Sequence, residues 1–118
     1  YLKPLFAYAK DELAFALSIN SAGGIIHCHQ LANGMINRVE FSARQIVEIA
    51  IRDNAAYIIL AHNHISDVAL PSRADAAATK LIDDTLSSIG VCLVDHMIVS
   101  GDEYVSMRES GYFARAEN

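Results

Sequence analysis

Two histidines one residue apart, His62 and His64, open the stretch HNHISDVALPSRAD, and Asp75 closes it. In an extended chain, residues i and i+2 point to the same side of the backbone, about 7 Å apart. Two imidazoles on one side can therefore converge on one metal ion. With Asp75 they would form a set of two histidines and one carboxylate. Such a set leaves a fourth tetrahedral position for water, which is the composition of a catalytic zinc site.

The same stretch also has an explanation without a metal. Ser72 and Asp75 have the spacing of a capping box, in which a serine side chain begins a helix and an acid three residues later reaches back to it. A carboxylate in the first turn of a helix is also favoured by the helix dipole. The residues taken alone leave the metal site and the simple helix cap both open.

The apolar pattern predicts the elements that must position these residues. Strands are expected over residues 12–20, 24–32, 56–61, 91–101 and 103–107, and helices over 42–54 and 72–88. Ser42 and Gln45 have capping-box spacing at the start of the first helix, and Gly90 ends the second. Strands interleaved with two helices predict an α/β domain with a mixed β-sheet flanked by helices.

Composition limits the class of protein. A chain of 118 residues with 53% hydrophobic and 19% charged residues is a single folded domain and not a disordered segment. The net charge of −5, without a basic cluster, argues against direct DNA binding by this segment. Cys28 and Cys92 form no CxxC motif and are expected to be buried and reduced, with a single disulfide as the alternative. No signal peptide or membrane-spanning run is present, so a cytoplasmic protein is expected. Residues 1–118 begin at Tyr1 without an initiator methionine, and we expect a domain excised from a longer protein whose N-terminal part is missing here.

The stretch resembles the signature of the JAMM metallohydrolases, also called MPN+ or JAB proteins. That signature is His-x-His, seven residues, Ser, two residues and Asp, and His62, His64, Ser72 and Asp75 match every fixed position. The closer resemblance is to the RadC family of this superfamily. It rests on IILAHNH at 58–64, PSRAD at 71–75 and LVDHMIVSG at 93–101, and it extends from about residue 11 to 113.

The resemblance implies a JAB/MPN (cytidine-deaminase-like) fold and a zinc-dependent hydrolase of amide, peptide or isopeptide bonds. His62, His64 and Asp75 would be the Zn²⁺ ligands, and Ser72 would stabilise the oxyanion beside the metal-bound water. The superfamily also uses a glutamate from an earlier strand as general acid and base, and the matching residue here is Glu12. A solvated glutamate at a strand end is the competing interpretation of Glu12.

The chain departs from the family pattern beside the predicted site. RadC-like sequences usually have Pro after the second histidine and Gly two residues further on, where this chain has Ile65 and Asp67. The usual Pro-Arg-Glu at the first helix reads Ala43-Arg44-Gln45. Since no ligand is changed, these departures concern loop shape and substrate preference. The alternative functions are a RadC-type DNA-repair-associated or interaction module and a scaffold that has lost activity.

Three further histidines are interpreted as structural. His27 and His29 have i, i+2 spacing, but no carboxylate with a matching spacing accompanies them, so they are expected to form one face of a strand. His96 belongs to the Asp-His pair of the family pattern, and no chemical role is assigned to it.

Overall fold

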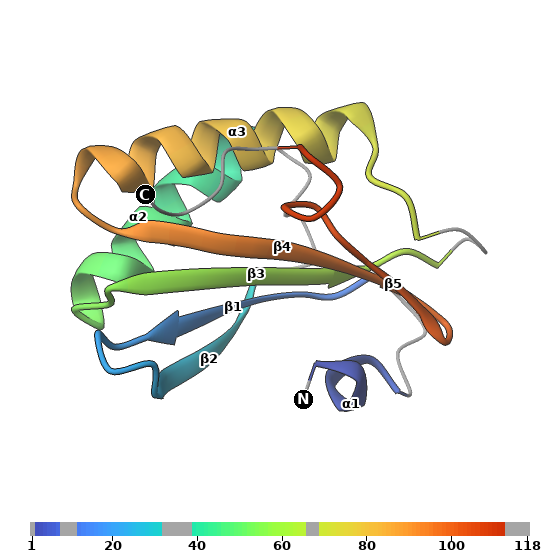
Figure 1. Cartoon of the computed structure of the whole chain (residues 1–118), viewed down its shortest axis with the longest axis horizontal. Helices are drawn as coiled ribbons and strands as arrows, with labels where there is room; N and C mark the ends of the chain where they lie inside the picture. Colours follow the sequence, from blue (N-terminus) through green and yellow to red (C-terminus); the bar gives the residue numbers. More distant parts are fainter. Residues whose placement is uncertain (1, 8–11, 32–38, 66–68, 113–118) are drawn as a thin grey trace.

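The computed structural model describes residues 2–7, 12–31, 39–65 and 69–112 of the chain (Figure 1). The elements in chain order are α1 (Lys3–Phe6), β1 (Ala14–Ile19), β2 (Ile25–Leu31), α2 (Val39–Arg52), β3 (Tyr57–Asn63), α3 (Arg73–Ser88), β4 (Cys92–Ser100) and β5 (Glu103–Ser106). The predicted α/β fold with a mixed sheet and flanking helices is confirmed.

The sheet has the strand order β2-β1-β3-β4-β5. β1 is antiparallel to both of its neighbours, β3 and β4 are parallel, and β5 is antiparallel to β4. Parallel strands need a crossover connection, and α3 supplies it between β3 and β4. This topology brings the start of α3 back to the carboxyl end of β3, which is where open α/β sheets place their ligands.

The two faces of the sheet are covered differently (Figure 1). α2 and α3 pack on one face, where Ile46 and Ile82 join alternate strand residues such as Leu60 in the larger core cluster. The short helix α1 covers part of the opposite face, and its Phe6 makes an edge-to-face contact with Phe15, with ring centroids 5.3 Å apart. Because strand side chains alternate between faces, His62 belongs to the face covered by α2 and α3.

Some boundaries differ from those that the sequence predicts. α2 begins at Val39 and not at Ser42, so Ser42 lies inside the helix and the Ser42–Gln45 spacing does not mark its start. Local capping signals and propensities are weak against tertiary context. β3 continues to Asn63, because His62 pairs with Ala14 on one side and with Ile98 on the other. Helix α1 was not predicted.

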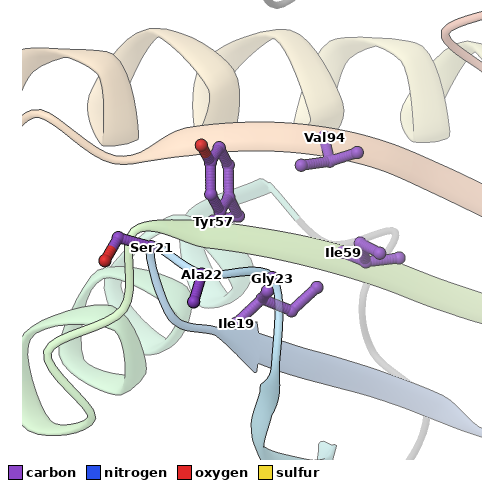
Figure 2. Close-up of a pocket in the computed structure, with 7 residues that line it drawn as sticks. All are labelled: Ile19, Ser21, Ala22, Gly23, Tyr57, Ile59 and Val94. Atoms are coloured by element: carbon purple, nitrogen blue, oxygen red, sulfur yellow. The ribbon is translucent and has the colours of Figure 1, made fainter.

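An open depression of about 410 Å³ lies on the face opposite α2 and α3, beside the turn between β1 and β2 (Figure 2). It is lined by Ile19, Ser21, Ala22, Gly23, Tyr57, Ile59 and Val94. These residues include no carboxylate, imidazole or thiol. Within the described ranges, no helix is long and apolar enough to cross a membrane.

Candidate metal centre

β3 positions both histidines of the His-x-His pair. His62 is the second-last residue of β3, and only 2% of its surface is exposed. His64 lies one residue beyond the strand, where its backbone amide donates to the Val99 carbonyl at 2.9 Å. This bond continues the pairing of β3 with β4, so both imidazoles are held on one side of the sheet end.

The start of α3 positions the carboxylate. The predicted capping box is confirmed: the Asp75 amide donates to Ser72 Oγ at 3.0 Å, and the Ser72 amide donates to Asp75 Oδ2 at 2.8 Å. The other carboxylate oxygen, Oδ1, is buried and accepts no hydrogen bond from the described residues. The cap therefore uses Oδ2 of Asp75 and leaves Oδ1 facing His62, so the two interpretations of this stretch are compatible.

The three side chains form a compact triangle. The Nε2 atom of His62 lies 3.1 Å from the Nε2 atom of His64. The two rings face different oxygens of Asp75: His62 Nε2 lies 3.4 Å from Oδ1, and His64 Nε2 lies 3.2 Å from Oδ2. Ligand atoms of a tetrahedral zinc with bonds of 2.0–2.1 Å are separated by about 3.3 Å. A buried carboxylate oxygen without a partner beside two imidazoles fits a bound cation, because such an oxygen is costly to bury alone.

The environment keeps Asp75 ionised. Burial opposes its charge, but the neighbouring His62 imidazole and the hydrogen bond from the Ser72 amide outweigh that effect and hold the pKa of Asp75 well below its ordinary value. The Asp75 side chain is 1% exposed and that of His64 is 17% exposed. Solvent or substrate therefore reaches this group from the side of His64.

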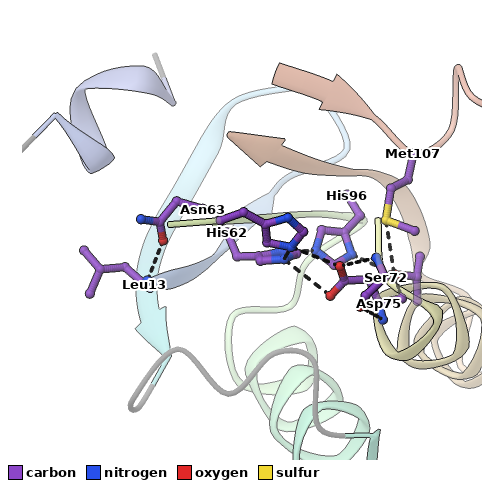
Figure 3. A network of polar contacts seen from close by, with 9 residues as sticks. Leu13, His62, Asn63, Ser72, Asp75, His96 and Met107 are labelled. Carbon is purple, nitrogen blue, oxygen red and sulfur yellow. Dashed lines mark hydrogen bonds and ion pairs between the residues drawn. The ribbon is translucent and has the colours of Figure 1, made fainter. Parts of the chain in front are cut away.

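His96, to which the sequence assigned no role, contacts a predicted ligand. Its Nε2 lies 2.8 Å from Nδ1 of His62 (Figure 3). Its Nδ1 lies 2.7 Å from Thr79 Oγ1. Complete burial lowers the pKa of His96 to about 3, so its ring is neutral at pH 7. The Thr79 hydroxyl in turn donates to the Asp75 carbonyl at 2.7 Å.

This chain of contacts assigns the protons. Because the Thr79 hydroxyl gives its single proton to the Asp75 carbonyl, it accepts from Nδ1–H of His96. The Nε2 of neutral His96 then accepts from Nδ1–H of His62. Nε2 of His62 is left with a free lone pair that faces His64 and Asp75. Outer contacts of this kind fix the tautomer of metal-binding histidines.

Glu12 lies next to this centre in the strand register. Ala14 pairs with His62 in the antiparallel ladder, so the same register continued by two residues places Glu12 across from His64, on the same face. Two bonds pin this end of β1: the Leu13 amide donates to Asn63 Oδ1 at 2.6 Å, and the Asn63 amide donates to the Leu13 carbonyl (Figure 3). Glu12 is exposed, and its catalytic role stays a prediction.

Asp95, which precedes His96 in the family's Asp-His pair, has different hydrogen-bond partners from those of the His96 ring. Its carboxylate accepts from the Ser106 hydroxyl and from the amides of His96 and Arg108, so it ties the segment after β5 to β4. Sequence reasoning missed Thr79, although its position one turn after Asp75 places both residues on one helix face.

An α/β domain with a His-x-His pair at the end of a parallel strand and an acid in the first turn of the following helix has the architecture of a JAB domain. The chain belongs to the family of RadC-like JAB domains, whose model matches residues 1–112.

Curated relatives carry the name UPF0758 protein. The relative from Bordetella petrii is 40% identical over 111 residues, which are 94% of this chain and 49% of that protein. The relative from Photorhabdus laumondii is 37% identical over 95% of this chain and 49% of its own length. The relative from Streptococcus gordonii is 39% identical over 87% and 46%. The chain thus spans about half the length of the curated relatives it matches.

Proposed function

We propose that this domain is a zinc-dependent hydrolase of amide bonds in which His62, His64 and Asp75 hold the metal. The observation that carries the proposal is the cluster of ligand atoms: the Nε2 atoms of His62 and His64 lie 3.1 Å apart, and each lies within 3.4 Å of one oxygen of the buried Asp75 carboxylate. Its dimensions suit a tetrahedral ion with one position left open. Membership of the RadC-like JAB family supports the same assignment.

The chain's own residues have distinct parts in this hydrolysis. When bound, zinc would lower the pKa of a water molecule to about 7 and polarise the substrate carbonyl. The Glu12 carboxylate takes a proton from the attacking water and delivers it to the leaving amine. The Ser72 oxygen is an acceptor in the helix cap, so its hydroxyl proton remains available to donate to the developing oxyanion.

His96 and Thr79 act as positioning residues. They hold Nδ1 of His62 protonated and leave its Nε2 available as a ligand. Neither residue reaches solvent, since both have no exposed surface. Their contribution is therefore to metal affinity and ligand orientation, and not to proton exchange with the substrate.

Metal content tests the proposal directly. Wild type and the His62→Ala/His64→Ala variant are purified without chelator after growth with added zinc, and zinc is measured by elemental analysis. The variant should hold about one zinc fewer per chain, because it lacks two of three ligands. Equal zinc contents in two folded proteins would contradict the proposal. Circular dichroism establishes that the variant is folded.

Activity is tested on a fluorogenic peptide mixture and on a lysine ε-linked isopeptide, which separate the two substrate classes. Chelator should abolish cleavage of the preferred substrate, and added zinc should restore it in wild type but not in His64→Ala. Cleavage by His64→Ala at the wild-type rate would reject the metal-dependent mechanism.

The DNA-repair-associated alternative makes a different prediction. With a net charge of −5, this domain should bind duplex DNA weakly and without sequence preference, because few phosphates can be neutralised together. Tight binding in an anisotropy assay at physiological salt would favour the repair module over the hydrolase.

A further inference from the structure

A second group of potential metal ligands lies at the opposite edge of the sheet from β5. His27 and His29 stand on edge strand β2, and Asp53 directly follows α2. Their ligand atoms all lie within 4.8 Å of one another. Spacing along the chain does not join these residues, since Asp53 is 24 residues after His29. The carboxylate that the sequence pattern lacks beside the two histidines is supplied by the tertiary fold.

The strand register brings the two imidazoles to the end of α2. His27 is opposite Ser18, and His29 is opposite Ala16, so both point to the face that α2 covers. The imidazoles stack with ring centroids 4.5 Å apart and planes inclined by 22°. Cys28 between them belongs to the opposite face, where it packs against the smaller core cluster. The thiol therefore points away from this group.

Asp53 is held in place by two contacts. Its Oδ2 lies 2.7 Å from Nε2 of His29 and accepts from the Ser18 hydroxyl at 2.6 Å. Both contacts use the same carboxylate oxygen. Ser18 is fully buried, so it is a fixed donor beneath the carboxylate. Metal-binding carboxylates are commonly oriented by an outer hydrogen bond of this kind.

The position of Asp53 calls for a compensating positive charge. Its amide donates to the Ile49 carbonyl, so the carboxylate sits at the C-terminal end of α2, where the helix dipole disfavours an anion. The Asp53 side chain is only 9% exposed, which limits screening by water. One protonated imidazole would balance this single charge, but a protonated ring is no longer a metal ligand. A divalent cation balances it with both imidazoles neutral and acting as ligands.

We propose that His27, His29 and Asp53 form a second transition-metal site, separate from the His62–His64–Asp75 centre. Two imidazoles and one carboxylate suit Zn²⁺ or Cu²⁺, and not Mg²⁺ or Ca²⁺, which prefer oxygen ligands. His27 is exposed, so water completes the coordination. The bound ion fastens edge strand β2 to the end of α2 and stabilises the fold by mass action.

Zinc titration of a chain that lacks the first centre tests this site independently of the proposed hydrolase. The His62→Ala/His64→Ala variant is stripped with chelator, and Zn²⁺ binding is measured by competition with a fluorescent indicator. This background should bind about one Zn²⁺ per chain, and the ion should raise its melting temperature. Absence of binding in the folded background would overturn the proposal.

Further substitutions in that background locate the ion. His29→Ala should weaken Zn²⁺ binding by about tenfold or more, and exposed His27→Ala should do the same with little effect on folding. Ser18→Ala should weaken it by roughly tenfold to a hundredfold through loss of the outer contact. Cys28→Ser is the matched control between the two histidines and should leave affinity unchanged. Equal affinity in background, His27→Ala and His29→Ala proteins would overturn the assignment.

Discussion

Nε2 of His96 lies 2.8 Å from Nδ1 of His62, and neither ring is appreciably exposed to solvent. The contact joins adjacent parallel strands, since His62 is on β3 and His96 is on β4. It also connects the candidate metal centre to α3 through Thr79. The buried imidazole of His96 thus orients the predicted ligand His62, and Thr79 on α3 holds the His96 ring in turn.

Substitutions of His96 should separate orientation of His62 from simple packing. His96→Asn keeps a polar group near the Nδ1 position and loses the acceptor for His62, so zinc affinity of the first centre should fall roughly tenfold to a hundredfold. His96→Gln keeps an amide oxygen near the Nε2 position and should retain more of the affinity. The measurement is zinc competition in proteins that also carry His29→Ala.

Asp95→Asn is the matched control, because it perturbs the neighbouring residue without touching the metal centre. Wild-type affinity in both His96 variants would show that the His62–His96 contact does not govern metal binding. Equal losses in the two variants would favour a packing role.

Acid should destabilise the metal-free protein through His96. The ordinary pKa of 6.5 is lowered to about 3 in the folded state by complete burial and by His62. Between these values the unfolded chain binds a proton that the folded chain excludes, so the free energy of unfolding decreases as pH falls below 6.5. Above 6.5 this group has no effect on the pH dependence. Urea unfolding in EDTA at about pH 7 and about pH 5 measures the change.

His96→Gln removes this titration and is the comparison protein. Its deficit in unfolding free energy relative to wild type should be larger at neutral pH than in acid. A deficit that stays constant across the range would contradict neutral burial of His96.

The sequence predicted the parts of the site that local signals define. His62 and His64 follow from i, i+2 spacing at the end of an apolar run, and Asp75 follows from its place in a capping box. These features depend on neighbours within a few residues. The α/β class followed from the alternation of strand and helix patterns for the same reason.

The parts that the sequence could not predict depend on contacts between distant elements. Asp53 meets His29 only because β2 lies at the sheet edge beside the end of α2. His96 meets His62 only because β3 and β4 are parallel neighbours in one register. No spacing rule encodes either pairing. The extension of β3 over polar His62 and Asn63 was missed because ladder pairing, and not hydrophobicity, determines it.

Ser72 should show two separable roles. Ser72→Ala removes the capping oxygen and the hydroxyl together, so the free energy of unfolding should fall by about 1 kcal/mol. Turnover should fall by roughly two orders of magnitude with zinc retained, if the hydroxyl stabilises the oxyanion. Urea unfolding and initial rates on the cleaved peptide measure the two effects.

Ser72→Gly distinguishes these roles, because glycine costs a helix cap only a few tenths of a kcal/mol. The glycine variant should have nearly the unfolding free energy of wild type, and its turnover should be as low as that of Ser72→Ala. Full turnover in the glycine variant would reduce Ser72 to a helix cap.

Glu12 is predicted to move protons without binding the metal. The register places it across from His64, whose side chain is the exposed member of the centre. Glu12→Gln should leave zinc affinity nearly unchanged, while hydrolysis falls by about two to four orders of magnitude, the usual contribution of a positioned acid or base. His64→Ala should instead lose zinc and activity together.

Asp11→Asn is the matched control for Glu12→Gln, since it removes the same charge from the adjacent position. If general acid–base catalysis by Glu12 operates, Asp11→Asn should hydrolyse near the wild-type rate, and the bell-shaped dependence of kcat/KM on pH should lose its acidic limb only in Glu12→Gln. Similar small losses in both variants would indicate a general effect of negative charge near the site. Hydrolysis by Glu12→Gln at the wild-type rate would assign the proton transfer to another group, while the zinc measurement would still report on His62, His64 and Asp75.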